Sequence, residues 1–304
     1  LKNAIESILA NNYKEIEILI INDNEYVEND ILSLIKTFDD KRIHYHRNIN
    51  TKGGNGARNT GILKAKGDII AFLDEDDEYL PERLKKVYAK LQNISEDVGG
   101  CLTGFEYWDG IELKKYPEIL DGDITKKILT ENYNFGNSSN FVFKRDAIKK
   151  IGLWDEKLKR HQDFEYILRF LRFFKLTSIN EVLLRINGHS TRPSSEIMIN
   201  SKIRYFFKAR HSIQKLNEVE RNNFFYKQFK ELYQQTAGEG KILYACFFYR
   251  KAKRCNSNIK KGIDFKFFLK LVLSPFFKVR FFLWEKYKLT IFFKKKHRHK
   301  YLKK

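Results

Sequence analysis

The sequence predicts an α/β fold built on a doubly wound, mostly parallel sheet. Amphipathic helical segments alternate with short apolar, β-branched runs through the first half of the chain, and this alternation is typical of βαβ units. The run at 16–21 is expected to be buried on both faces, as in strands that helices cover on each side. Two of these runs end in acidic positions, at Asn22-Asp23 and at Asp74. Ligands of such sheets bind beyond the carboxyl ends of the strands, so both acidic sites should face one crevice.

Each expected element follows from a local pattern. Ile5, Ile8 and Leu9 recur at helical spacing, which predicts the first helix, and β-branched runs predict the strands. In chain order we expect helices at 1–9, 31–38, 56–65, 84–91, 146–151 and 163–174, and strands at 16–21, 43–46, 68–73, 100–107, 139–143 and 176–186.

The two ends of the chain differ from its centre. The sequence begins inside a helix, whereas nucleotide-binding α/β domains of this kind open with a central strand. We therefore expect an N-terminal truncation that leaves the sheet without its first strand. After about residue 195 glycine becomes rare, and Lys, Arg and Phe dominate. We predict one domain at 1–192 and a basic, aromatic-rich helical region at 193–304.

The composition indicates a globular protein with an anionic partner. The 304 residues are 42% apolar, which is enough for a large core. A formal net charge of +20 points to nucleic acid, anionic lipid or a phosphorylated substrate. Three widely spaced cysteines favour reduced thiols over disulfides or a cysteine metal site. No leader pattern and no run near the roughly 20 apolar residues of a membrane span is present, so we expect an intracellular chain.

Four consecutive acids, Asp74, Glu75, Asp76 and Asp77, follow the apolar run at 69–73. Carboxylates this close repel one another unless a cation lies among them, and Mg²⁺ or Mn²⁺ is typically held by one or two carboxylates with substrate phosphates and water. Alternate residues leaving a strand point the same way, so Asp74 and Asp76 can face one cavity. The alternative is an acidic helix start, which Pro81 in a first turn also fits.

A glycine-rich loop at 52–56 leads into a helix that carries Arg58 in its first turns. Backbone amides at a helix start, together with a guanidinium, suit a diphosphate. Taken alone, the loop is equally consistent with a surface turn. Its position one helix and one strand before the four acids favours a binding loop.

Three motifs in this order resemble family 2 glycosyltransferases of the GT-A fold. They are Ile-Ile-Asn-Asp-Asn at 20–24, Ala-Arg-Asn-Thr-Gly at 57–61, and Phe-Leu-Asp-Glu-Asp-Asp at 72–77 with Pro-Glu-Arg-Leu at 81–84. The resemblance covers about residues 1–190 and is to bacterial members that assemble capsule, lipopolysaccharide or other surface glycans. It implies a Rossmann-like nucleotide-diphospho-sugar transferase fold, with the basic helical region as a C-terminal extension.

The resemblance also implies roles for single residues. Asp23 matches the acid that accepts a hydrogen bond from the uracil of a UDP-sugar, and Arg58 matches the basic residue beside the diphosphate. Asp74 and Asp76 match the D-x-D pair that binds the donor and Mn²⁺ or Mg²⁺, with Asp76 the leading metal ligand and Asp74 its partner. Asp77 is a candidate for a donor contact or for support of the metal site.

A further motif at 160–169, Arg-His-Gln-Asp-Phe-Glu-Tyr-Ile-Leu-Arg, resembles the segment where inverting members carry their general base. Asp163 falls on that position. It would take the proton of an acceptor hydroxyl as the oxygen attacks the anomeric carbon opposite the leaving UDP, while the metal and Arg58 neutralise the diphosphate. By residue type alone, Asp163 could instead be a helix N-cap.

The chain departs from the family pattern in two places. The opening strand, with the P-x-Y-N-type segment that lines the nucleotide pocket, is not in the sequence. Part of the wall around the nucleotide base is therefore expected to be absent. In the segment 184–190, Asn187 stands where many members place a histidine, and His189 follows two residues later. We keep His189 as a secondary candidate for the site.

Beyond residue 200 the chain interleaves phenylalanines with lysines and ends in a basic run at 294–300. Such a segment fits a peripheral membrane surface, and Pro275 and the lysines argue against a membrane span. Nucleic-acid binding or packing on the catalytic domain are the alternatives. The resemblance favours the membrane and disfavours nucleic acid, because surface-glycan enzymes often extend sugars on a polyprenyl diphosphate at the inner face of the membrane.

The sequence thus predicts an inverting, metal-dependent hexosyl- or N-acetylhexosaminyltransferase. It would move a sugar from a nucleotide-sugar donor, a UDP-sugar, to a hydroxyl of a surface polysaccharide or a polyprenyl-diphosphate-linked glycan. Its expected location is the cytoplasm, peripheral to the inner face of the plasma membrane. One alternative is an inactive, truncated remnant whose tail binds membrane or polyanion. Another is nucleotidyl transfer, which would release pyrophosphate and not UDP.

Overall fold

The computed structural model describes residues 1–92, 94–131, 133–188 and 193–255. One compact unit spans Leu1–Ser257. His189 and the basic aromatic segment beyond residue 255, for which the sequence suggests a site role and membrane binding, lie outside the described residues.

Helices and strands alternate through the first half of this unit, and helices alone make up its end. The helices are α1 (Lys2–Leu9), α2 (Glu28–Phe38), α3 (Gly54–Lys64), α4 (Arg83–Gln92), α5 (Thr125–Glu131), α6 (Arg145–Ile151), α7 (Gln162–Phe170), α8 (Ser195–Lys215), α9 (Glu218–Gly238) and α10 (Ile242–Cys255), with short 3-10 turns η1 (Glu25–Val27) and η2 (Ser138–Asn140). The strands are β1 (Ile18–Asn22), β2 (Ile43–Arg47), β3 (Ile69–Ala71), β4 (Glu78–Tyr79), β5 (Val98–Trp108), β6 (Leu113–Tyr116), β7 (Val142–Lys144) and β8 (Lys175–Asn187).

The strands form two sheets. Strands β1 and β2 pair in parallel as a sheet of their own. The six-stranded sheet has the order β3-β7-β5-β8-β4, and β6 pairs with β5. The long strands β5 and β8 run parallel, while the shorter strands join antiparallel. Most paired residues are in parallel ladders, and the predicted α/β class is confirmed.

Strands β1 and β3 carry the two acidic motifs at their carboxyl ends, yet they belong to different sheets. Among the described residues, no strand lies between them to join the two sheets. The glycine-rich loop at the start of α3 lies between the two motifs in sequence.

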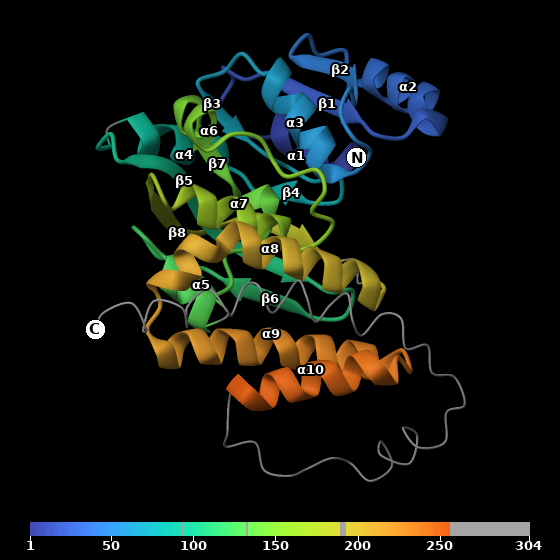
Figure 1. The fold of residues 1–304 in the computed structure, drawn as a ribbon. Coiled ribbons are helices and arrows are strands. Elements are labelled where there is room, and N and C mark those ends of the chain that lie inside the picture. Colours follow the sequence, from blue (N-terminus) through green and yellow to red (C-terminus); the bar gives the residue numbers. More distant parts are fainter. Residues whose placement is uncertain (93, 132, 189–192, 256–304) are drawn as a thin grey trace. The chain divides into compact units, whose positions relative to one another are not determined.

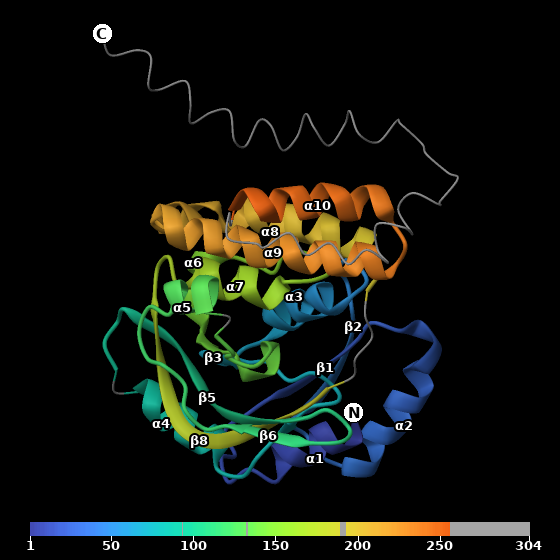
Figure 2. The same cartoon turned by 90° about the horizontal axis from the view of Figure 1, so that it is seen from below.

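Helices cover both sides of the strands (Figure 1). Figure 2 shows α1, α2 and α4 on one side and α3, α5, α6 and α7 on the other, with α8, α9 and α10 stacked beyond them. Helix α7 packs against α8, and α9 packs against α8 and α10. The candidate base on α7 therefore lies between the sheet and the C-terminal helices.

One main hydrophobic core runs from the sheet into these C-terminal helices. It includes Leu102 and Phe143 of the sheet and Phe206, Phe224 and Phe248 of α8, α9 and α10. Burial of such large apolar side chains is the main force that holds the helices to the sheet. The predicted division of the chain at residue 192 stays a prediction, since both sides of it belong to this compact unit.

Two local predictions were wrong, and three short elements were missed. The segment expected to be a strand at 139–143 begins as the turn η2, because the Asn137 side chain accepts a hydrogen bond from the Ser139 N–H and closes a 3-10 turn before the strand. The helix expected at 163–174 ends at Phe170, and the chain turns there into β8. The elements β4, β6 and α5 were missed because each is too short for a periodic pattern.

None of the helices in the described part of the chain combines the length and the apolar character that crossing a bilayer requires.

Candidate active site

Asp77 connects the acidic turn, residues 74–77, to two other segments of the chain by hydrogen bonds. Its side chain is 1% exposed. One carboxylate oxygen accepts hydrogen bonds from the Asn137 amide at 2.9 Å and the Ser139 hydroxyl at 2.6 Å. The other accepts the backbone N–H of Asn187 at 2.9 Å. Burial raises the pKa of Asp77 to about 6, although these hydrogen bonds favour its ionised form. With its oxygens occupied in this way, Asp77 is placed to hold the turn in shape.

The turn η2 supports the acidic turn from the other side. Arg83 is fully buried and donates to the main-chain carbonyls of Ser139 at 3.3 Å and Asn140 at 3.2 Å. The Ser139 hydroxyl in turn accepts the backbone N–H of Asp74 at 2.9 Å. The buried guanidinium thus fixes a backbone segment whose side chains position both Asp74 and the residues that follow it.

Arg58 and Asp74 form the charged centre of the site. The Arg58 guanidinium donates to one Asp74 carboxylate oxygen and to the Ser138 hydroxyl, both at 2.6 Å. The Ser138 hydroxyl donates to the other Asp74 oxygen at 3.2 Å. Burial opposes the charge of Arg58, but the carboxylates of Asp74 and Asp163 raise its pKa above the ordinary value. A permanent positive charge is therefore held next to the predicted D-x-D pair.

Asp163 presents an unpartnered carboxylate oxygen beside this centre. It is the second residue of α7, and the N-cap position belongs to His161, so Asp163 does not cap the helix. Its Oδ1 atom is enclosed and has no hydrogen-bond partner among the described residues. Burial raises the pKa of Asp163 to about 6, with Arg58 lowering it and Asp74 raising it. A carboxyl group in this state is suited to accept a proton near neutral pH.

Asp23 lies at the other end of the glycine-rich loop. Its carboxylate accepts the backbone N–H of Gly53 at 2.7 Å and the side-chain amide of Asn48 at 2.6 Å. Gly53 precedes α3 with a φ of 122°, a conformation that favours glycine. Asp23 thus shapes the loop, and its predicted contact with uracil stays a prediction.

The loop folds back on itself at Gly56. A Cβ atom at this position would lie 1.8 Å from the carbonyl oxygen of Thr51. Only glycine allows this approach without a backbone shift. Gly56 is therefore needed for the shape of the loop that precedes Arg58.

We expect the Gly56→Ala variant to lose stability and donor affinity together. Overpacking of this kind costs about 1–3 kcal/mol, and relief of the clash would move the loop. Thermal unfolding and UDP binding are the measurements. Gly238→Ala is the matched control, since a Cβ there meets nothing within 4 Å. An unchanged Tm and UDP affinity in Gly56→Ala would contradict the role given to the loop.

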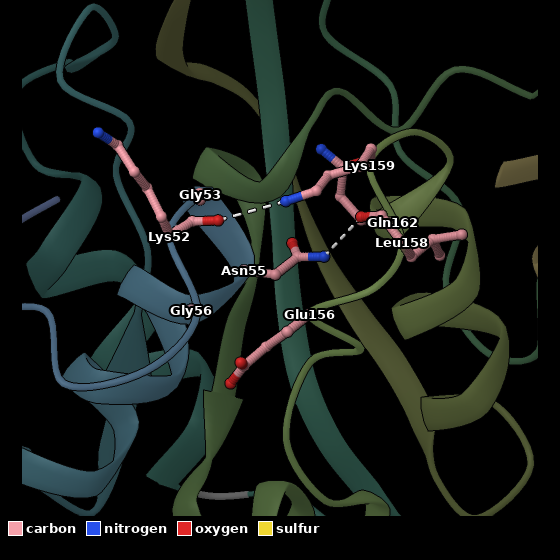
Figure 3. Close-up of a pocket in the computed structure, with 9 residues that line it drawn as sticks. Lys52, Gly53, Asn55, Gly56, Glu156, Leu158, Lys159 and Gln162 are labelled. Carbon is pink, nitrogen blue, oxygen red and sulfur yellow. Dashed lines mark hydrogen bonds between the residues drawn. The ribbon is translucent and has the colours of Figure 1, made fainter. Parts of the chain in front are cut away.

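A pocket lies between the glycine-rich loop and the segment 156–162 (Figure 3). Asn55 donates from its side-chain amide to the carbonyl oxygens of Asp155 at 2.8 Å and Leu158 at 2.9 Å. Figure 3 shows the Lys159 amine directed at the Lys52 carbonyl, 3.3 Å away. The start of α3 and the Lys159 amine face this pocket, together with the Glu156 carboxylate.

Asp74 and Asp76 fit a cation that is shared with substrate phosphates. The described residues contain no cluster of three or more His, Cys, Asp or Glu side chains suited to a metal ion. Asp74 keeps 35% of its side chain exposed, and the exposed Asp76 is held on the same turn by the Asn187 amide, which donates to its carbonyl oxygen at 2.6 Å. Mg²⁺ is often bound by only one or two carboxylates, with phosphates and water completing its shell, so this donor set suits it.

The structure brings most of the predicted site residues together. Arg58, Asp74, Asp77 and Asp163 interact electrostatically with one another. Asp76 lies on the same turn, whereas Asp23 reaches the site only through the loop that it holds. The individual roles given to these residues stay predictions.

Sequence reasoning missed the residues that position the charged centre. They are Arg83, Asn137, Ser138, Ser139 and Asn187. The polar run at 137–140, directly before the apolar residues 141–143, was the available signal, but the predicted strand at 139–143 begins within it. Asn187 had been noted only as the occupant of a position where relatives carry histidine.

The first half of the chain, residues 1–152, matches the family model described as Glycosyl transferase family 2. The chain belongs to this family. It is a glycosyltransferase, as the sequence motifs predicted, and the GT-A fold inferred from those motifs is confirmed.

Curated relatives of this glycosyltransferase have related descriptions. A Campylobacter jejuni protein described as GalNAc(5)-diNAcBac-PP-undecaprenol beta-1,3-glucosyltransferase is 27% identical over 278 residues, which are 84% of this chain and 85% of that protein. An uncharacterized glycosyltransferase of Rickettsia typhi is 27% identical over 64% of this chain, and the match spans 62% of its own length. An Escherichia coli protein, the putative colanic acid biosynthesis glycosyl transferase WcaA, is 27% identical over 55% of this chain and 60% of that protein.

Solved structures resemble the glycosyltransferase in fold. The crystal structure of Staphylococcus aureus TarS 1-349 in complex with UDP-GlcNAc has a TM-score of 0.53 at 13% identity. The similarity covers 83% of this chain and 84% of the TarS chain. At this identity the comparison supports the fold alone.

Proposed function

We propose that this glycosyltransferase moves a sugar from a UDP-sugar donor to a hydroxyl group of a surface polysaccharide or lipid-linked glycan, with inversion at the anomeric carbon. The observation that carries the proposal is the unpartnered Oδ1 atom of Asp163, whose carboxylate interacts electrostatically with the Arg58–Asp74–Ser138 cluster. One group can accept a proton while a neighbouring cation stabilises a departing diphosphate. The donor class is proposed by analogy with TarS, which has a similar fold and was crystallised in complex with UDP-GlcNAc. The descriptions of the Campylobacter and E. coli relatives support the acceptor class.

On the donor side, the chain supplies positive charge and backbone amides. Arg58 would contact the diphosphate, and the start of α3 would add its dipole and N–H groups. Asp74 and Asp76 would hold Mn²⁺ or Mg²⁺ together with the diphosphate. When bound, the metal ion would neutralise charge on the departing UDP.

On the acceptor side, Asp163 would act as the general base. Its carboxylate takes the proton of the acceptor hydroxyl while that oxygen forms a bond to the anomeric carbon. The bond between the anomeric carbon and the diphosphate oxygen breaks, and UDP leaves with the electron pair. Attack from the face opposite UDP inverts the configuration of the carbon.

We further propose that the acceptor is met at an anionic membrane surface. Three features of the sequence support this proposal: the net charge of +20, the phenylalanines interleaved with lysines beyond residue 200, and the basic run at 294–300. Binding to vesicles that contain an anionic lipid, and not to neutral vesicles, is the direct test.

The decisive experiment is the identification of the released nucleotide. Incubation with a panel of UDP-sugars, Mn²⁺ and a membrane extract as acceptor source should release UDP and label the lipid or polysaccharide fraction. Release of pyrophosphate would indicate nucleotidyl transfer. Absence of any UDP release or UDP binding would indicate an inactive chain and would refute the proposal.

Transfer should depend on pH through Asp163. Its pKa of about 6 means that the carboxyl is protonated below this pH and cannot accept a proton. The value of kcat/KM for the acceptor should therefore fall by about tenfold for each pH unit below 6 and level off above it. Asp77 titrates in the same range, so the pH profile of Asp77→Asn serves as the comparison. If the fall of kcat/KM at low pH disappears in Asp77→Asn and persists in Asp163→Asn, the assignment of Asp163 as the general base is wrong.

A further inference from the structure

Helix α8 contacts both halves of the candidate site, although it lies beyond the residues that match the family model. Two neighbouring residues make these contacts. Arg204 reaches the segment that holds the glycine-rich loop, and Tyr205 reaches the segment that carries the candidate base. In both figures α8 runs beside α7 (Figures 1 and 2).

Arg204 is paired with Asp155. Its Nε and Nη2 atoms donate to the two carboxylate oxygens at 2.6 and 2.7 Å, and the Lys208 amine lies 3.4 Å from the same carboxylate. The Asp155 side chain is 6% exposed, whereas Arg204 is 37% exposed. Burial opposes the charge of Asp155, yet the two cations of α8 hold its pKa below the ordinary value. A two-pronged pair of this kind fixes direction as well as distance.

The segment that Arg204 fixes is attached to the glycine-rich loop. The carbonyl oxygens of Asp155 and Leu158 accept both hydrogen bonds of the buried Asn55 amide, at 2.8 and 2.9 Å. The carboxylate of the next residue, Glu156, accepts the backbone N–H of Thr51 at 3.0 Å. The position of the loop that precedes Arg58 thus depends on the segment 155–158.

The segment that Tyr205 contacts leads into the base. The Tyr205 ring stacks on His161 with centroids 5.4 Å apart and planes inclined by 24°. His161 lies two residues before Asp163 and has a φ of 60°, a left-handed conformation that histidine adopts only when its surroundings hold it there. The ring nitrogen Nε2 of His161 is buried and has no hydrogen-bond partner among the described residues, so stacking and packing define its position.

We propose that Arg204 and Tyr205 are positioning residues of the transfer reaction: Arg204 sets the glycine-rich loop for the donor diphosphate, and Tyr205 sets the segment that carries Asp163. This inference rests on the proposed function. It predicts that the two residues act on different steps. Loss of Arg204 weakens donor binding, and loss of Tyr205 slows proton transfer.

For Arg204 we compare Arg204→Gln with Arg210→Gln, which removes an exposed arginine from the same helix. Arg204→Gln should weaken UDP binding and raise the donor KM by about 3- to 30-fold with kcat nearly unchanged. Arg210→Gln should match the wild type. The Asp155 carboxylate is buried and would keep only Lys208 as a cation, so the Tm of Arg204→Gln should fall, whereas the Tm of Arg210→Gln should match the wild type. In a double-mutant cycle, Asp155→Asn should add no further loss in the absence of Arg204.

For Tyr205 we compare Tyr205→Leu with Tyr205→Phe, which keeps the ring that stacks on His161. Tyr205→Leu should lower kcat and shift the acidic limb of the pH profile while UDP affinity stays within about twofold of the wild type. For Tyr205→Phe, both kcat and the acidic limb of the pH profile should match the wild type. Equal losses in the two variants, or a loss of UDP affinity equal to the loss in kcat, would overturn the role of the ring.

Unchanged UDP affinity in Arg204→Gln would overturn the role of Arg204. If Arg204→Gln does not fold, Arg204→Lys takes its place, with the same expected direction. If the wild-type chain binds no UDP, the proposed function fails, and hydrogen exchange at the amides of 51–56 then decides the inference. Faster exchange in Arg204→Gln than in Arg210→Gln would support it, and equal exchange would refute it.

Discussion

The Asp163→Asn variant should lose about 10²- to 10⁴-fold in kcat, the usual contribution of a positioned general base. The substitution keeps the shape of the side chain and removes its negative charge, and with it the ability to accept a proton. Because Oδ1 of Asp163 has no hydrogen-bond partner in the described structure, the amide breaks no hydrogen bond of that atom. UDP affinity should stay close to that of the wild type, since Arg58 keeps its bonds to Asp74 and Ser138.

The measurement is the rate of sugar transfer, with UDP binding and thermal unfolding as parallel readouts. Asp146→Asn is the matched control, because Asp146 is also an acid in the first turn of a helix but is exposed and pairs only with Lys149 at a surface salt bridge. It should retain full activity. If Asp163→Asn transferred sugar at the rate of Asp146→Asn, Asp163 would not be the base.

Much of the fold could be predicted from the sequence, because its long elements carry strong local patterns. Strand β5 is buried along nearly all of its length and β8 at two stretches near its ends, and both strands were expected from the sequence. The helix α3 and its glycine-rich loop were expected from glycine and arginine spacing. The two-residue strand β4 was not, since pairing with the distant strand β8 decides its conformation. Strand β6 was not either, since its four residues, which pair with the neighbouring end of β5, carry no clear alternation of their own.

The site was predictable in its charged residues and not in their supports. The order of the motifs identified Asp74 and Asp163, because chemistry restricts the residue types at these positions. The turn η2 is held by Arg83, more than fifty positions away in the chain, and no local pattern reveals such a partner. The raised pKa of Asp163 likewise follows from burial, which only the packed fold determines.

The Asp76→Ala variant should show the second large effect, a loss of metal-dependent activity. Removal of a carboxylate that shares a divalent ion with the diphosphate should lower kcat/KM by about 10²-fold or more and raise the Mn²⁺ concentration needed for half-maximal rate. The turn itself should survive, because Asp77 anchors it through Asn137, Ser139 and Asn187. Isothermal titration with Mn²⁺ in the presence of UDP measures the loss directly, without any acceptor.

Glu75→Ala provides the control, since it removes the same charge from the neighbouring exposed position. Both variants change the net charge of the turn by one unit, so an effect of charge alone would be equal in the two. A specific ligand requires Asp76→Ala to weaken Mn²⁺ binding far more than Glu75→Ala does. Equal weakening would show that the turn acts only as a diffuse negative patch, and the D-x-D assignment would then be wrong. Asp74→Asn should weaken Mn²⁺ binding as well. It also releases Arg58 from its ion pair, which Asp76→Ala leaves intact, so the two variants should differ in their loss of UDP affinity.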